Sequence, residues 1–134
     1  GSQREERLEC LEKRMEELFD LWPKIKDTEV FVTIDNAEEG WDGHVGFVPS
    51  YLEEINPNPA GKIAVTCGPP IMIKFVIKAL EKMGYSDEQV ITTLEMRMKC
   101  GIGKCGRCNI GSEFICLDGP VFNLAQLKKL PPEW

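Results

Sequence analysis

The sequence contains one histidine, no long hydrophobic run and a deficit of positive charge, and each shortage excludes a class of protein. A Rieske iron–sulfur centre needs two histidines, so His44 alone cannot supply one. No stretch approaches the roughly 20 apolar residues that a membrane-spanning helix requires. Acidic residues outnumber basic ones by 22 to 16, which gives a net charge of −6. Nucleic acid is therefore not expected as the main partner.

The N-terminus is charged and lacks the apolar segment of a secretory leader. Gly1-Ser2 is typical of a tag remnant, so residues 1–2 are expected to be foreign and the rest to come from a longer protein. Cys10 and Cys67 stand apart from the other cysteines, and unpaired thiols suit a reducing compartment. We therefore expect a cytoplasmic protein.

The four remaining cysteines lie within seventeen residues near the C-terminus. They follow the spacing C-x4-C-x2-C-x7-C, and the first three match the plant-type [2Fe–2S] ferredoxins. A loop that gathers three sulfurs needs backbone freedom, which the intervening glycines supply. The spacing predicts a [2Fe–2S] cluster used for electron transfer, with the ligands Cys100, Cys105, Cys108 and Cys116.

Other uses of these cysteines remain open. Four cysteines can hold a structural zinc ion, although zinc sites usually have two short knuckles and this chain has one. A zinc-stabilised docking module without a redox role is therefore the alternative function, and two disulfides are a weaker one. Residues 101–106 also match G-x-G-x-x-G, but a dinucleotide fingerprint follows a strand and opens a helix. Because these glycines alternate with cysteines, we assign them to the metal loop.

Strand and helix patterns alternate along the chain. Apolar, β-branched runs predict three strands, over residues 29–35, 62–66 and 90–95. Helical signals predict four helices, over residues 4–22, 48–55, 71–83 and 124–129. The first helix is amphipathic and is expected to cover a sheet, with a short coiled-coil seam as the alternative. The alternation predicts an α/β fold with a parallel sheet.

A second motif, Cys67-Gly68-Pro69-Pro70, links the strand 62–66 to the helix 71–83. A helix N-terminus has unpaired N–H groups and a partial positive charge, which can hold a phosphate or a carboxamide. The alternative is an ordinary turn into a helix that begins with proline. Parallel strands bring their carboxyl ends to one edge of a sheet, so this motif and the cysteine loop are expected near the same edge.

Together these motifs resemble the C-terminal half of the ferredoxin–NADP reductase superfamily. Within it, the chain is most similar to the electron-transfer subunits of dihydroorotate dehydrogenase and the gamma subunits of nickel–iron hydrogenases and sulfhydrogenases. The resemblance is carried by residues 40–46, 65–70 and 98–122. It implies a partial, Rossmann-type NAD(P)-binding domain over residues 3–95 and a [2Fe–2S]-binding subdomain over residues 96–134.

The resemblance also implies a chemistry. In the family, the loop equivalent to residues 67–70 lies under the nicotinamide and pyrophosphate of NAD(P)H, with the residue equivalent to Cys67 close to the hydride-carrying carbon. Cys67 is thus the expected catalytic residue, and Cys67, Gly68, Pro69 and Pro70 are the expected cofactor-binding residues. FAD takes the hydride, and electrons then pass singly through the cluster to a partner catalytic subunit.

Parts of that family's architecture are missing from the sequence: the flavin-binding barrel and the first two strands of the nucleotide domain. FAD is therefore expected only in a longer parent, NAD(P) binding is expected to be weak, and the isolated chain is expected to be inactive. The missing strands would separate strand 29–35 from strand 62–66. These strands must pair directly, borrow strands from another copy, or leave exposed edges that favour self-association.

Four cations crowd the cysteine loop: Arg97, Lys99, Lys104 and Arg107. Cations of this kind lower the pKa of thiols and offset the charge of a cluster, and they also suit docking on an acidic partner. Among other residues, His44 is expected to be structural, and Trp41 is expected to pack in its loop. Asp35 ends a strand where Rossmann folds bind ribose, although a structural role is favoured.

Overall fold

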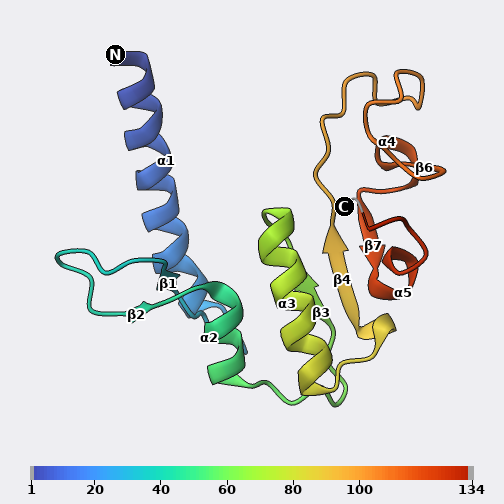
Figure 1. Cartoon of the computed structure of the whole chain (residues 1–134). Coiled ribbons are helices and arrows are strands. Elements are labelled where there is room, and N and C mark those ends of the chain that lie inside the picture. Colours follow the sequence, from blue (N-terminus) through green and yellow to red (C-terminus); the bar gives the residue numbers. More distant parts are fainter. Residues whose placement is uncertain (1, 133–134) are drawn as a thin grey trace.

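The computed structural model describes residues 2–132, and Figure 1 shows how its elements are arranged. Gly1, Glu133 and Trp134 lie outside the described residues. They belong to the expected tag remnant and to the end of the expected iron–sulfur subdomain. None of the helices in residues 2–132 combines the length and apolarity needed to cross a bilayer.

The central sheet is built from the strands β3 (Ala64–Thr66), β4 (Val90–Thr93) and β7 (Val121–Asn123). β3 and β4 are parallel, with Val65 beside Ile91, and helix α3 (Pro70–Met83) connects them. The parallel arrangement is confirmed for this pair. β7 is an addition that the sequence analysis missed, and it runs antiparallel to β4 with Phe122 beside Thr92.

Helix α3 begins and ends where its sequence indicates. Pro70 opens the helix, where a missing N–H is harmless. Gly84 ends it with φ +95°, a left-handed conformation that glycine adopts without strain. Five residues of α3 are buried in the core: Ile73, Val76, Ile77, Ala79 and Leu80.

One hydrophobic core joins α3 and β4 to the C-terminal region. Val90 of β4 and Ile115 and Leu127 from beyond residue 95 are completely buried in it. The C-terminal region comprises the hairpin of β5 (Asn109–Ile110) and β6 (Glu113–Phe114) and two short helices, α4 (Ile115–Asp118) and α5 (Leu124–Leu127). The predicted division at residues 95 and 96 thus lies within a shared core.

Helix α1 (Ser2–Leu21) confirms the first predicted helix, and a 3-10 turn at Trp22–Lys24 follows it. The expectation that it covers a sheet is wrong. Met15, Leu18 and Trp22 are all exposed, and Figure 1 shows α1 projecting away from the other elements. The side chains of Leu8 and Leu11 lie outside the described part. The neighbouring strand β1 (Thr33–Ile34) has two residues and offers no surface for a helix of this length.

The N-terminal half forms a small unit of its own. β1 is much shorter than the predicted strand 29–35, and it pairs in parallel with β2 (His44–Val45). Helix α2 (Val48–Ile55) matches its prediction to the residue and packs against α3. Because β1 does not pair with β3, the structure realises the arrangement with exposed edges. Val65 of β3 accordingly leaves 71% of its surface exposed.

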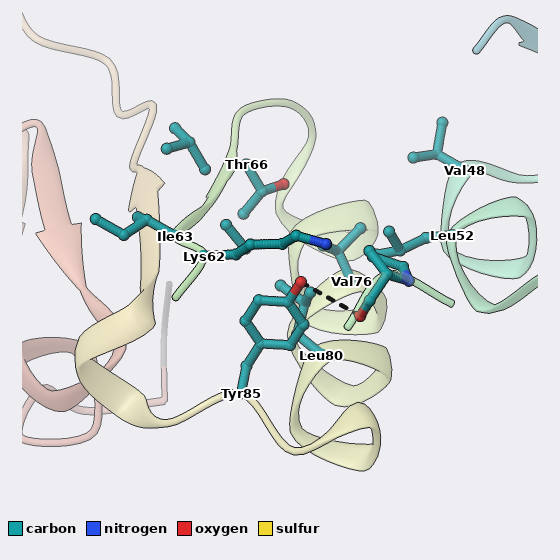
Figure 2. Close-up of a pocket in the computed structure, with 11 residues that line it drawn as sticks. Val48, Leu52, Lys62, Ile63, Thr66, Val76, Leu80 and Tyr85 are labelled. Carbon is teal, nitrogen blue, oxygen red and sulfur yellow. Dashed lines mark hydrogen bonds between the residues drawn. The ribbon is translucent and has the colours of Figure 1, made fainter. Parts of the chain in front are cut away.

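A groove of about 480 Å³ opens between α2, α3 and β3, as Figure 2 shows. Val48 and Leu52 come from α2, whereas Val76 and Leu80 come from α3. At one end the Tyr85 hydroxyl donates a hydrogen bond to the carbonyl of Pro57 at 3.5 Å. The groove lies where the sheet is incomplete, so apolar side chains that a full sheet would bury remain accessible.

Candidate metal centre and nucleotide loop

The cysteine loop wraps its backbone around the sulfur of Cys100. The N–H groups of Ile102, Lys104 and Cys105 donate hydrogen bonds to this sulfur, at 3.4, 3.3 and 3.4 Å. Gly101 and Gly103 make the tight turn possible, because both have φ +70°, where an L side chain is strained. The loop is therefore a preformed cradle for a negatively charged sulfur.

The three N–H donors change the acidity of that sulfur. They lower the pKa of Cys100 from 9.0 to about 6, with the N–H of Cys105 as the largest cause, followed by those of Ile102 and Lys104. A thiolate is the form that binds iron or zinc. The sequence analysis attributes a lowered pKa to the neighbouring cations. The structure corrects this attribution, since the cause is backbone hydrogen bonding.

The other three cysteines lie at different depths. Cys105 is exposed and within hydrogen-bond reach of Cys100, whereas Cys108 is 1% exposed and belongs to the hydrophobic core. Cys116 lies on α4, and the hydrogen bond from Ile115 N–H to the Cys108 carbonyl, at 3.1 Å, brings it beside Cys108. Burial, followed by contact with the Cys108 thiol, raises the pKa of Cys116.

Cys100 lies beside Cys105 and Cys116 lies beside Cys108, and Cys116 also interacts with Cys100 and with the N–H of Gly103. Across residues 2–132, no three His, Cys, Asp or Glu side chains converge closely enough to hold one metal ion. A cluster with two irons can take one pair of thiolates on each iron, whereas a zinc ion needs four donors around one point. The donor chemistry and the cradle at Cys100 fit a two-iron cluster, and the set of four ligands stays a prediction.

The second motif forms the connection from β3 to α3. Cys67 is exposed, and Gly68 lies so close to Met72 that an added Cβ would collide with the end of that side chain. Within the described residues no side chain caps α3, so the N–H groups of its first turn point out of the helix end without a side-chain acceptor. This geometry can accept an anionic or carbonyl group of a ligand.

A hollow of about 190 Å³ separates the two motifs. Gly68, Pro70 and Lys74 line one side, and Thr93 and Glu95, with Met96 beside them, line the other. Both motifs leave the same edge of the sheet, as the parallel strands require. The cysteines do not line this hollow, whose far end is closed by Ile110.

One residue that lines the hollow, Thr93, has a polar atom that the sequence analysis missed. Its hydroxyl is buried and has no hydrogen-bond partner among the described residues. A buried hydroxyl of this kind is costly unless a hydrogen bond satisfies it. No pattern in the sequence singles out a threonine at the end of an apolar strand.

His44 and Trp41 make structural contacts, whereas the role of Asp35 stays a prediction. The imidazole of His44 is hydrogen-bonded to the Thr33 hydroxyl at 2.8 Å and to the Glu54 carboxylate at 3.1 Å. It also stacks on Tyr51, with ring centroids 3.7 Å apart. Trp41 donates its indole N–H to the His44 carbonyl at 3.0 Å, which confirms a packing role in the loop. Asp35 lies beside an apolar pocket of about 540 Å³ near α2 and α3.

Comparison with known proteins matches both halves of the chain. Residues 1–78 match the family described as oxidoreductase NAD-binding domain. Residues 95–128 match the family described as the iron–sulfur cluster binding domain of dihydroorotate dehydrogenase B. The second match begins at the predicted metal loop and includes all four clustered cysteines.

Individual relatives agree with these matches. Sulfhydrogenase 1 subunit gamma of Pyrococcus furiosus is 38% identical over 123 residues, which cover 89% of this chain and 41% of that protein. The probable dihydroorotate dehydrogenase B (NAD(+)) electron transfer subunit of Thermoplasma acidophilum is 34% identical over 119 residues, 89% of this chain and 44% of that protein. The chain thus spans less than half the length of these relatives.

Proposed function

The chain belongs to the family of oxidoreductase NAD-binding domains and carries an iron–sulfur cluster binding domain of the dihydroorotate dehydrogenase B type, and on this premise we propose that it is the electron-transfer part of an FAD- and NAD(P)-dependent oxidoreductase. Residues 3–95 are the partial NAD(P)-binding domain, and residues 96–134 are the [2Fe–2S]-binding subdomain. FAD belongs to a part of the parent protein outside this chain.

The observation that carries the proposal is the cradle at Cys100. Three N–H groups stabilise this sulfur as a thiolate. Cys105, Cys108 and Cys116 supply the other three sulfur ligands of the cluster. A bound [2Fe–2S] cluster supplies one-electron transfer between a flavin that handles electron pairs and a partner that takes electrons singly. Hydrogen bonds to the sulfurs, together with the exposure of Cys105, are the means by which this chain sets the potential of the centre.

The nucleotide motif has a separate role in the proposal. Cys67, Gly68, Pro69 and Pro70 hold the nicotinamide end of NAD(P)H at the N-terminus of α3, next to the hollow that Gly68, Pro70 and Thr93 line. The partner is a catalytic subunit of the hydrogenase, sulfhydrogenase or dihydroorotate dehydrogenase type, because the relatives are named as subunits of such enzymes. All six cysteines are free, which suits a cytoplasmic setting.

Reconstitution tests the cluster. The chain is loaded anaerobically with iron and sulfide, and we expect about two irons per chain and a paramagnetic signal after dithionite reduction. Cys105→Ser is expected to abolish that signal. Cys10→Ser removes an exposed cysteine on α1 and is the matched control, which retains the signal. A colourless protein that holds one zinc ion would instead establish the zinc-stabilised docking module.

The nicotinamide role requires the parent protein with its flavin. Titration of that protein with NADH or NADPH is expected to bleach the flavin absorption. If neither nucleotide bleaches the flavin in a protein with a full cluster signal, the proposed reaction with NAD(P)H is contradicted. The proposed electron relay through the cluster is not affected by that result. The two parts of the proposal are therefore tested separately.

A further inference from the structure

We propose that the cysteine loop forms a docking face for an acidic electron-transfer partner whose contact surface has an apolar centre. The loop face, as we name it, is made of six residues: Arg97, Lys99, Ile102, Lys104, Arg107 and Leu117. This inference rests on the proposed function, because it assumes that electrons leave the chain at the metal loop. It adds the chemistry of the surface that receives them.

The charge of the loop face opposes that of the rest of the chain. Residues 96–108 contain four cations and no acidic residue, although the whole chain carries a net charge of −6. All four cations are exposed. The ion pairs found within residues 2–132 involve other cations, at Lys82, Lys128 and His44. The positive charge of the loop is therefore available to a partner.

Two apolar side chains are also exposed on the loop face. Ile102 is 58% exposed and Leu117 is 59% exposed. Ile102 comes from the loop and Leu117 from α4, but both lie next to Gly103. A Cβ added at Gly103 would collide with the Leu117 side chain. Exposed apolar side chains surrounded by charge are typical of protein–protein contact surfaces, in which the apolar centre is desolvated and the rim remains polar.

The loop face also includes the sequence neighbours of the most exposed of the four clustered cysteines. Cys105 is exposed and lies between Lys104 and Arg107 in the sequence, whereas Cys108 is buried. A protein bound to the loop face would lie closer to Cys105 than to the other thiols at greater depth. The same surface therefore combines electrostatic attraction, an apolar contact and the nearest approach to the metal loop.

An acidic protein fits this surface better than a nucleic acid does. The apolar centre gains nothing from a phosphate backbone, and the surrounding acidic surface of the chain repels an extended polyanion. A globular acidic protein contacts a limited area and can match both the charge and the apolar centre. Charge complementarity of this kind sets specificity and association rate more than affinity.

The test uses the reconstituted full chain and three probes: an acidic flavodoxin in its oxidised form, a basic cytochrome c and a short DNA duplex. We expect binding of flavodoxin at about 20 mM salt, with an affinity that falls at least about tenfold at about 200 mM salt. Protection from hydrogen exchange on flavodoxin binding, measured by mass spectrometry, should map to the peptides that contain residues 97–107 and Leu117. DNA is expected to bind more weakly than flavodoxin.

Variants distinguish an effect of the loop face on binding from an effect of the net charge of the chain. Lys99→Glu combined with Lys104→Glu is expected to lower flavodoxin affinity at least about tenfold and to leave cytochrome c binding undiminished. Lys24→Glu combined with Lys62→Glu makes the same change in net charge at exposed positions outside the loop, and it should change the affinity less than about twofold. Ile102→Ser should weaken binding about threefold and leave the salt dependence intact.

The outcomes distinguish the docking face from the proposed function. Cluster absorption is measured in every sample, so a wild-type chain that never acquires a cluster contradicts the proposed function itself. A full cluster signal without flavodoxin binding, or with equal losses in the two lysine pairs, overturns the docking face alone. Tighter binding of the DNA duplex than of flavodoxin also overturns it.

Discussion

At the scale of single residues, Cys100 is governed by its hydrogen bonds. Its pKa of about 6 lies below the ordinary thiol value of 9.0 because three backbone N–H groups favour the thiolate. Folding of the metal-free loop is therefore linked to pH. The Cys100 thiolate contributes fully to the stability of the folded loop above about pH 9. This contribution decreases as the pH falls and is lost below about pH 6.

Alkylation of the metal-free chain tests this acidity. Iodoacetamide reacts with thiolates, so modification of Cys100 is expected to rise with pH through a midpoint near 6. Peptide mapping by mass spectrometry identifies the modified residue. Cys100→Ser should remove the low-pH step from the total alkylation curve. A midpoint for Cys100 at the ordinary thiol value would contradict the hydrogen-bonded cradle.

Some features at this scale could be predicted from the sequence. Gly101, Gly103 and Gly106 all have positive φ, as a tight loop between cysteines requires. The depth of each cysteine could not be predicted. Cys108 enters the core together with Ile110 and Ile115, and the same core contains residues of α3 and β4, which lie far from Cys108 in the sequence. The orphan hydroxyl of Thr93 depends on the same packing.

At the scale of elements, His44 connects β2 to β1 and α2. Its imidazole bonds Thr33 of β1 and Glu54 of α2 and stacks on Tyr51. The N–H of Gly46 meanwhile donates to the Ile34 carbonyl at 2.8 Å and reports on the same unit. The unit lacks fully buried side chains in α2, so these polar contacts are a large part of what orders it.

His44→Ala is therefore expected to loosen this unit and leave the core intact. Loss of two hydrogen bonds and one stacking contact corresponds to about 2 kcal/mol, or about thirtyfold faster exchange of the Gly46 amide with solvent. Hydrogen exchange followed by magnetic resonance measures this rate. His44→Phe keeps the stacking and should show a smaller effect. An unchanged Gly46 rate in His44→Ala would show that the loop is ordered by other contacts.

Elements with strong local signals could be predicted, and short ones could not. α2 and α3 have proline near their starts and left-handed residues at their ends, so their sequences alone define them. α5 begins at Leu124, as the predicted helix 124–129 does, and Asn123 caps it by accepting the Gln126 N–H at 2.8 Å. In contrast, β5, β6 and β7 have two or three residues each, too few to show a periodic pattern. Their pairing is decided by tertiary contacts.

At the scale of the whole molecule, the open side of the central sheet is the dominant feature. Within residues 2–132, β3 pairs only with β4, and its other edge lies beside the apolar groove of Figure 2. The sequence analysis left three arrangements for this sheet. It could not choose among them because the choice depends on which strands are present to pair, and local patterns contain no such information. α1 projects because β1 and β2 have two residues each and offer no surface for a helix of this length.

Open edges of this kind favour association between copies. We expect concentration-dependent self-association of the chain, measured by sedimentation velocity. Val65→Lys places a charge on the exposed side chain of β3 and should weaken association at least about tenfold. Thr28→Lys adds the same charge at an exposed position outside the sheets and is the control. A chain that stays monomeric at every concentration would contradict this prediction.

The burial of Cys108 bears on how the protein matures. Cys108 is 1% exposed and belongs to the hydrophobic core, so little of its surface is open to an incoming iron atom. We therefore expect insertion to precede final closure of the core or to follow a local opening of the β5–β6 hairpin. Cluster insertion and the completion of folding are thus coupled. Conditions that rigidify the apoprotein should therefore slow its conversion to the holoprotein.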